Sequence, residues 1–172
     1  VAGLDGDKPF LKLLHNTGGK FEDVTTSTKL TTNKLVSGGV FGDFDNDGDV
    51  DIVIVNHNEP PSLLRNDVSG ANHWVKFKLV GVESNRSAIG ARVTVRYGGK
   101  VQAQEVLAQS SYLSVSDSRL HFGLGAAAVA DVEIRWPNGR VEKIDGVEAD
   151  RLVHVKEGAG VVRTERFAGR RV

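Results

Sequence analysis

The stretch "FGDFDNDGDVDIVIVN" (Phe41–Asn56) decides the fold, because a dense acidic turn passes directly into an apolar run. Aspartates occupy alternate positions of this turn, and Gly48 stands at the sixth position counted from the first of them. Alternate side chains of a curled loop converge on one point, and a glycine permits the sharp bend that such a loop needs. The turn therefore has the pattern of a cation-binding loop that leads into a β-strand.

The acidic turn needs a cation to balance its charge. Carboxylates about 4–6 Å apart near a protein surface repel one another by about 1 kcal/mol or more per pair. The segment 41–58 contains no lysine or arginine. Ligation by oxygen alone favours Ca²⁺, since Mg²⁺ keeps its waters and zinc prefers histidine or cysteine. The predicted ligands are the side chains of Asp43, Asp45, Asp47 and Asp51 and the backbone carbonyl of Asp49. The alternative is a solvated acidic turn without a metal.

Short β-prone runs separated by Gly, Asn and Asp surround the turn. The pattern Leu-Leu-x-Asn occurs at 13–16 and again at 63–66, an offset of 50 residues that is close to the length of one β-propeller blade. We therefore expect one blade-like antiparallel sheet. Its predicted strands are residues 10–15, 20–25, 36–42, 51–56 and 62–66. Because so small a sheet buries little apolar area, its exposed face should pack on the β-sandwich predicted for the following residues or on another copy.

The pattern changes after residue 72. In "HWVKFKLVG" (73–81) Val75, Phe77 and Leu79 alternate with Lys76 and Lys78, which predicts a strand with one buried and one solvent-exposed face. Further along, "WPNG" (136–139) predicts the turn of a hairpin, because proline presets φ and Asn-Gly tolerates positive φ. No window of twelve or more residues has a convincing helical period. The predicted class is all-β: a partial propeller blade at residues 1–70, an antiparallel β-sandwich at 71–158, and a basic tail at 159–172 that we expect to be solvated and partly disordered.

Two stretches of the sequence resemble known protein families. "FGDFDNDGDVDIVIVN" resembles the FG-GAP, or VCBS, repeat of integrin-type β-propellers, whose D-x-D-x-D-G-x-x-D loop binds Ca²⁺, and the likeness covers residues 1–67. The motifs "FGLG" (122–125) and "WPNG", within residues 72–157, resemble the ASPIC/UnbV domain. This domain follows such repeats in proteins similar to the cartilage acidic protein family and in many bacterial secreted proteins. The resemblance implies a secreted or extracytoplasmic setting, periplasmic or on the cell surface.

Composition limits the partners. The 172 residues hold 22 basic and 22 acidic side chains, so no global field recruits nucleic acid or an anionic membrane. No stretch approaches the roughly 20 apolar residues of a membrane-spanning helix, so we expect no membrane insertion. A closed propeller needs about four to eight blades, and this chain has material for little more than one. We therefore expect the C-terminal part of a larger propeller protein, with the incomplete blade as a possible contact between copies.

Two groups of residues suggest other functions, namely nucleotide binding and catalysis. Gly123-x-Gly125-x-x-Ala128 superficially matches a dinucleotide fingerprint, but no crossover helix follows it, which favours a β-turn. His57 and Glu59 could act as base and acid, but no nucleophile motif lies near them. We therefore expect a loop there, and no enzyme.

Three functions remain open at this point. The first is a non-catalytic, calcium-binding extracellular module for adhesion or ligand binding, whose partner is a protein or glycan. The second is a structural cap, in which the sandwich covers the open edges of the last blade. The third is part of a propeller hydrolase or lyase.

Overall fold

The computed structural model describes residues 2–5, 8–28, 35–67, 70–110 and 115–167. Within these ranges all regular secondary structure is β-strand, which confirms the predicted all-β class. The strands of the N-terminal part are β1 (Ala2–Asp5), β2 (Lys8–Leu11), β3 (Leu14–Asn16), β4 (Phe21–Asp23), β5 (Val36–Gly42), β6 (Asp51–Asn56) and β7 (Ser62–Leu64). Those of the C-terminal part are β8 (His73–Val80), β9 (Arg92–Tyr97), β10 (Lys100–Glu105), β11 (Leu120–Gly125), β12 (Val129–Arg135), β13 (Val141–Glu148), β14 (Arg151–Lys156) and β15 (Gly160–Glu165).

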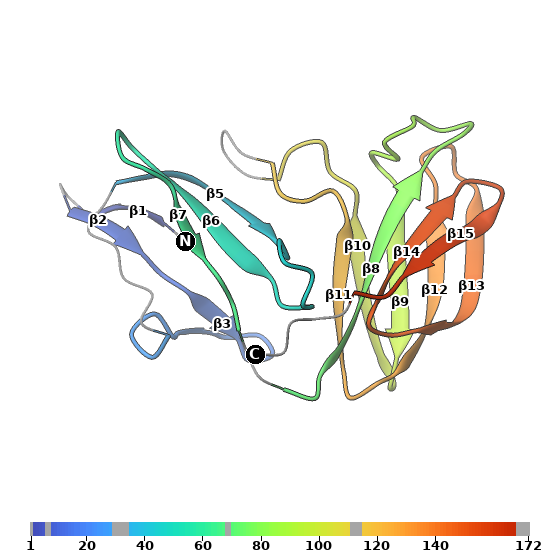
Figure 1. Ribbon diagram of the computed structural model, residues 1–172, viewed down its shortest axis with the longest axis horizontal. Helices are drawn as coiled ribbons and strands as arrows, with labels where there is room; N and C mark the ends of the chain where they lie inside the picture. The colour runs from blue at the N-terminus through green and yellow to red at the C-terminus, as the bar shows by residue number, and fades with distance from the viewer. Residues whose placement is uncertain (1, 6–7, 29–34, 68–69, 111–114, 168–172) are drawn as a thin grey trace.

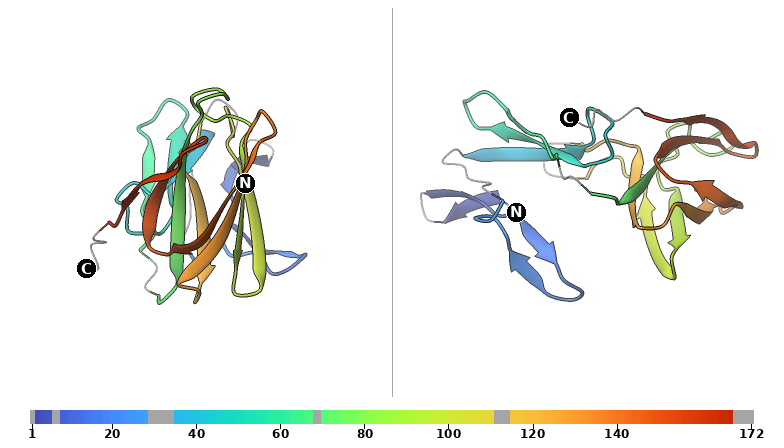
Figure 2. Two further views of the ribbon diagram at one scale, coloured as in Figure 1. Left: turned by 90° about the vertical axis from the view of Figure 1, so that its right-hand side faces the viewer. Right: turned by 60° about the horizontal axis from the view of Figure 1, so that its bottom comes forward.

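The N-terminal part forms three small sheets, and our prediction of one sheet is wrong. β1 pairs only with β2 and β3 only with β4, whereas β5, β6 and β7 form a three-stranded antiparallel sheet. Figure 1 shows these sheets at the left, and Figure 2 shows the β3–β4 hairpin projecting away from β5–β7. With three or four residues each, β1 to β4 are too short for wide pairing.

The N-terminal sheets have almost no core of their own. Ile54 is the one buried hydrophobic residue that lies before residue 74 among the residues whose burial the structure describes. Large apolar side chains stay exposed instead, with Phe21 at 68%, Phe44 at 53% and Leu63 at 52%. Hydrophobic burial is the main favourable term in folding. These sheets therefore depend on contacts with the rest of the protein for much of their stability.

The C-terminal part is a sandwich of two four-stranded sheets, ordered β10-β9-β12-β13 and β11-β8-β14-β15 (Figure 1, right). Alternate residues of both sheets point inward and form one core, in which Val75, Phe77, Val95 and Ile134 are fully buried. Phe77 contacts Phe122 edge to face, with 5.9 Å between ring centroids. The alternation read from the sequence thus identifies the core face of these strands correctly.

Two features of the sandwich differ from expectation. β14 pairs with β8 in parallel, so the sheet is mixed, although every other pair is antiparallel. The chain also forms β15 from residues 160–165, which pairs with β14. β15 is largely exposed, as we expected for this segment, but it is an ordered strand, so our prediction of a partly disordered end is wrong for residues 160–165. Residues 168–172 lie outside the described part.

The hairpin between β12 and β13 forms as predicted. The Trp136 amide donates to the Arg140 carbonyl at 2.8 Å, and Gly139 has a φ of 88°. Trp136 and Trp74 are both buried, at 1% and 8% exposure.

A membrane-spanning helix is not found among the residues that the structure describes.

Candidate metal centre

The acidic turn connects β5 to β6 and is folded around the carboxylate of Asp43. This side chain, 2% exposed, accepts hydrogen bonds from the backbone amides of Asp47 at 3.1 Å and Gly48 at 2.9 Å. Positive φ angles at Asn46 (59°) and Gly48 (102°) make the chain curl back on itself. A single buried carboxylate therefore organises the loop that was predicted to hold the metal.

Asp51 closes the loop from the other side. Its carboxylate is buried and accepts from the amide of Phe44 at 3.0 Å and from the amide of Asn66 at 2.8 Å. The second bond links the loop to the chain that follows β7. Because both Asp43 and Asp51 are fixed by backbone donors, their carboxylates are held in place before any ion arrives.

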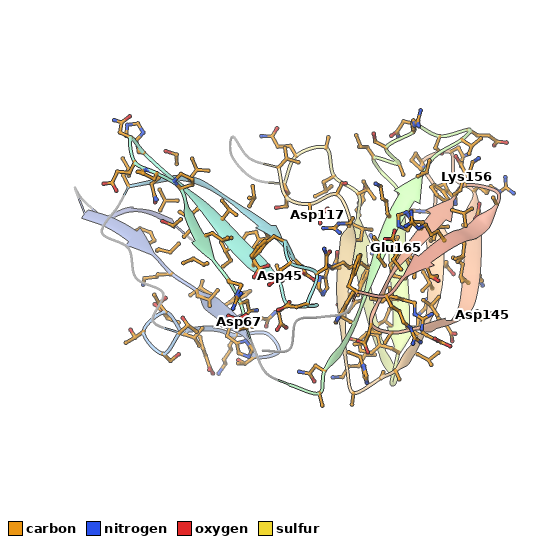
Figure 3. All side chains as sticks on the ribbon, viewed as in Figure 1. Asp45, Asp67, Asp117, Asp145, Lys156 and Glu165 are labelled. Carbon is orange, nitrogen blue, oxygen red and sulfur yellow. The ribbon has the colours of Figure 1, made fainter. Side chains whose placement is uncertain are left out.

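Three carboxylates converge. Asp43, Asp45 and Asp51 each present one oxygen, and these oxygens lie within 4.8 Å of one another. Ca²⁺ binds oxygens at about 2.3–2.6 Å, so two ligands on one ion are separated by about 5 Å at most. The spacing and the all-oxygen donor set both fit Ca²⁺. Asp45 lies at the end of the β5–β6 hairpin that faces the sandwich (Figure 3).

Asp47 and Asp49, also predicted as ligands, lie outside this group of three. The Asp47 carboxylate accepts from the amide of Asp49 at 2.8 Å. Burial and the neighbouring carboxylates of Asp45, Asp43 and Asp51 raise the pKa of Asp47 above its ordinary value. The charge repulsion expected from the sequence is therefore present. A ligand role for the Asp47 side chain and the Asp49 carbonyl stays a prediction.

Sequence reasoning missed one charged residue of the site. Lys76 of β8 was expected on a solvent-exposed face, but it is 1% exposed and its Nζ lies 2.5 Å from Asp43 Oδ2. Burial lowers the pKa of Lys76, and its hydrogen bond to Asp43 opposes that shift. The Nζ also lies 5.1 Å from the centre of the Trp74 ring. The loop thus receives a cation from a strand that begins 22 residues after Asp51 in the chain.

The loop is docked on the sandwich by further contacts. Arg119 Nη1 donates to Asn46 Oδ1 at 3.1 Å, and the Asp117 amide donates to the Phe41 carbonyl at 3.2 Å. Gly48 lies directly against the indole of Trp74. A cavity of about 150 Å³ remains at this junction, and both parts of the chain line it.

His121 lines the same cavity from the sandwich side. Its Nδ1 is buried and has no hydrogen-bond partner in the described part of the chain. Burial, reinforced by the positive charge of Lys76, lowers the pKa of His121 from 6.5 to about 4. The imidazole is therefore neutral at physiological pH and adds no further positive charge to the junction.

Comparison with known families agrees with this division of the chain. Residues 1–54 match the FG-GAP-like repeat, and residues 81–162 match the family described as ASPIC and UnbV. The chain joins an FG-GAP-like repeat to an ASPIC and UnbV domain. The acidic loop of residues 43–51, called the metal loop from here on for its proposed role, lies in the first match, and Lys76 precedes the second.

Curated relatives match well over half of the chain. Cartilage acidic protein 1 of Mus musculus is 33% identical over 126 residues, which cover 70% of this chain and 19% of the relative, and the Homo sapiens protein gives the same figures. The Xenopus tropicalis protein is 31% identical over 111 residues, covering 61% of this chain and 17% of its own length. The chain thus spans about one fifth of the length of the curated relatives it matches.

Neither the glycine motif at 123–128 nor the pair His57 and Glu59 forms a site with other described residues. His57 and Glu59, which follow the matched part of the FG-GAP-like repeat, are exposed in the turn after β6. In the ASPIC and UnbV domain, Gly123 and Gly125 lie in β11, Gly125 has a φ of 56°, and the Ala127 amide donates to the Leu124 carbonyl, so residues 126–128 form a tight turn between β11 and β12. No helix follows this turn, as a dinucleotide site would require.

Proposed function

We propose that this chain is a non-catalytic, calcium-binding module of a larger extracellular protein, in which it serves adhesion or ligand binding. The observation that carries the proposal is the convergence of Asp43, Asp45 and Asp51 within 4.8 Å. When bound, Ca²⁺ would supply two positive charges and rigid coordination at the β5–β6 turn. The chain's own residues hold Asp43 and Asp51 in position and shape the loop.

An extracellular setting suits this chemistry. Extracellular calcium modules bind the ion with dissociation constants of about 10⁻⁴–10⁻³ M, which match the abundance of calcium outside cells. The similarity to proteins named cartilage acidic protein 1 supports the same setting. The proposed partner is a protein or a glycan, without nucleic acid and without membrane insertion. Protein and glycan arrays probed with and without calcium would identify it.

A structural cap is a second function that one observation favours. The outer face of β8 buries Trp74 and Lys76 under the metal loop, so the sandwich covers one end of the FG-GAP-like repeat. The exposed Phe21, Phe44 and Leu63 are apolar positions of the repeat that further blades, or a second copy of the chain, would cover.

Calcium-dependent stability tests the proposal. An ion that binds the folded state alone stabilises it by RT ln(1 + [Ca²⁺]/Kd), about 2.7 kcal/mol at a hundredfold excess over Kd. Thermal unfolding of the parent in EDTA and in millimolar calcium should show this gain. Asp45→Asn removes one charge from the group of three and should weaken the calcium response. Asp49→Asn should change it little, because Asp49 lies outside that group.

A remote control separates the site from general charge effects. Asp145→Asn removes an acid on the far side of the sandwich (Figure 3), so its calcium response should equal the parent's. A parent melting curve that ignores calcium would contradict the proposal and leave a solvated acidic turn. Isothermal titration with calcium chloride gives the affinity and the stoichiometry independently of unfolding.

A further inference from the structure

The outer face of β8 contains two lysines in very different surroundings. Strand alternation places Lys76 and Lys78 on the same side, opposite the core residues Phe77 and Leu79. Lys78 is exposed, whereas Lys76 is 1% exposed. The difference arises because the metal loop covers the N-terminal half of this face and leaves the rest open. A buried lysine is costly unless it is paired, so its position calls for a physical explanation.

The partner of Lys76 is a carboxylate of the candidate metal centre. Its Nζ bonds Asp43 Oδ2 at 2.5 Å, and the same oxygen accepts from the Gly48 amide. A bound dication and the Lys76 ammonium would therefore both interact with the Asp43 carboxylate. Two cations attracted by one carboxylate repel each other, and the repulsion is strong where water is excluded.

We propose that Lys76 is a built-in counter-cation, supplied by the sandwich, which neutralises Asp43 in the metal-free protein and lowers the calcium affinity of the loop. The inference rests on the proposed calcium function. It makes Lys76 an affinity-determining residue that lies outside the metal loop. It also makes the affinity depend on docking, because undocking of the sandwich withdraws Lys76 from the loop.

Lys76→Met tests the proposal, with Lys78→Met as the matched control. Methionine keeps an unbranched apolar stem of similar reach and removes the charge. Isothermal titration with calcium chloride should show at least about tenfold tighter binding for Lys76→Met than for the parent. In EDTA the same variant should melt at a lower temperature than the parent, because Asp43 is left buried without its cation. Lys78→Met should change neither quantity.

A second variant keeps the test decisive if Lys76→Met does not fold without metal. Lys76→Gln removes the charge but keeps a hydrogen-bond donor for Asp43, so the same tightening should appear in a less perturbed protein. Unchanged or weaker calcium binding in the variant that folds would overturn the inference. A parent that binds no calcium would overturn the proposed function itself, so the two failures are distinguishable.

Discussion

Replacing Gly48 by alanine tests whether the metal loop is seated on the sandwich. Gly48 adopts a φ of 102°, and a Cβ added there would overlap the indole Nε1 and Cδ1 of Trp74. Trp74 cannot move aside freely, because it is 8% exposed. The substitution therefore introduces backbone strain and overpacking at the same position.

The expected loss follows from these two terms. Left-handed backbone costs a residue with a side chain about 1–2 kcal/mol. Overpacking of a well-packed contact costs about 1–3 kcal/mol more. We therefore expect Gly48→Ala to lower the free energy of unfolding by about 2–5 kcal/mol. Undocking of the loop would reduce the clash, and in that case Trp74 would become exposed.

Gly139→Ala provides the control, because Gly139 has a similar φ of 88° and no atom within 4 Å of an added Cβ. Gly139→Ala should lower the free energy of unfolding only by the cost of the strained backbone, about 1–2 kcal/mol. Urea unfolding followed by circular dichroism gives both free energies, and tryptophan emission of the folded state reports any exposure of Trp74. Equal losses in the two variants, with unchanged emission, would refute the docked arrangement of the loop.

Two pH predictions follow from perturbed groups in the sandwich. Burial alone would raise the pKa of Glu157, but the amides of Ser84, Val82 and Glu83 outweigh it and lower this pKa from 4.5 to about 2. The contribution of Glu157 to stability is therefore complete above about pH 4.5 and is lost as the pH falls toward 2. In Glu157→Gln the urea midpoint of unfolding should depend less on pH between 4.5 and 2 than it does in the parent. His121, with a pKa lowered to about 4, is protonated first in the unfolded chain, so stability should fall by up to about 3 kcal/mol between pH 6.5 and 4. His121→Gln should remove this part of the pH dependence, and an unchanged slope would contradict the buried, neutral imidazole.

Local pattern was sufficient for much of the fold. The predicted strands at 36–42 and 51–56 coincide with β5 and β6, and the "WPNG" turn forms the β12–β13 hairpin. These elements depend on alternation and turn chemistry, which neighbouring residues specify. The same holds for the metal loop, since the spacing of the aspartates places three of them together.

Long-range pairing was not predictable in the same way. The alternation of β8 shows which residues face away from the core, but it does not show what covers them, so Lys76 was assigned to solvent. β15 was missed because "GVVRTE" has little apolar surface, and its strand is defined by pairing with β14. The separate hairpins of β1 to β4 likewise depend on which partners are available, and a run of β-prone residues does not specify that.

Asp43 connects the metal loop to the sandwich. Its carboxylate accepts two loop amides, contributes to the group of three oxygens, and binds the buried ammonium of Lys76. Removing any one of these partners leaves a buried charge less well satisfied, so folding of the loop, occupancy by a cation and docking on the sandwich are thermodynamically linked. If the loop binds calcium as proposed, its state would reach the sandwich through Asp43 and through the contacts of Asn46 and Gly48. Calcium added to one part should therefore change the stability of the other, although the two parts have separate sheets.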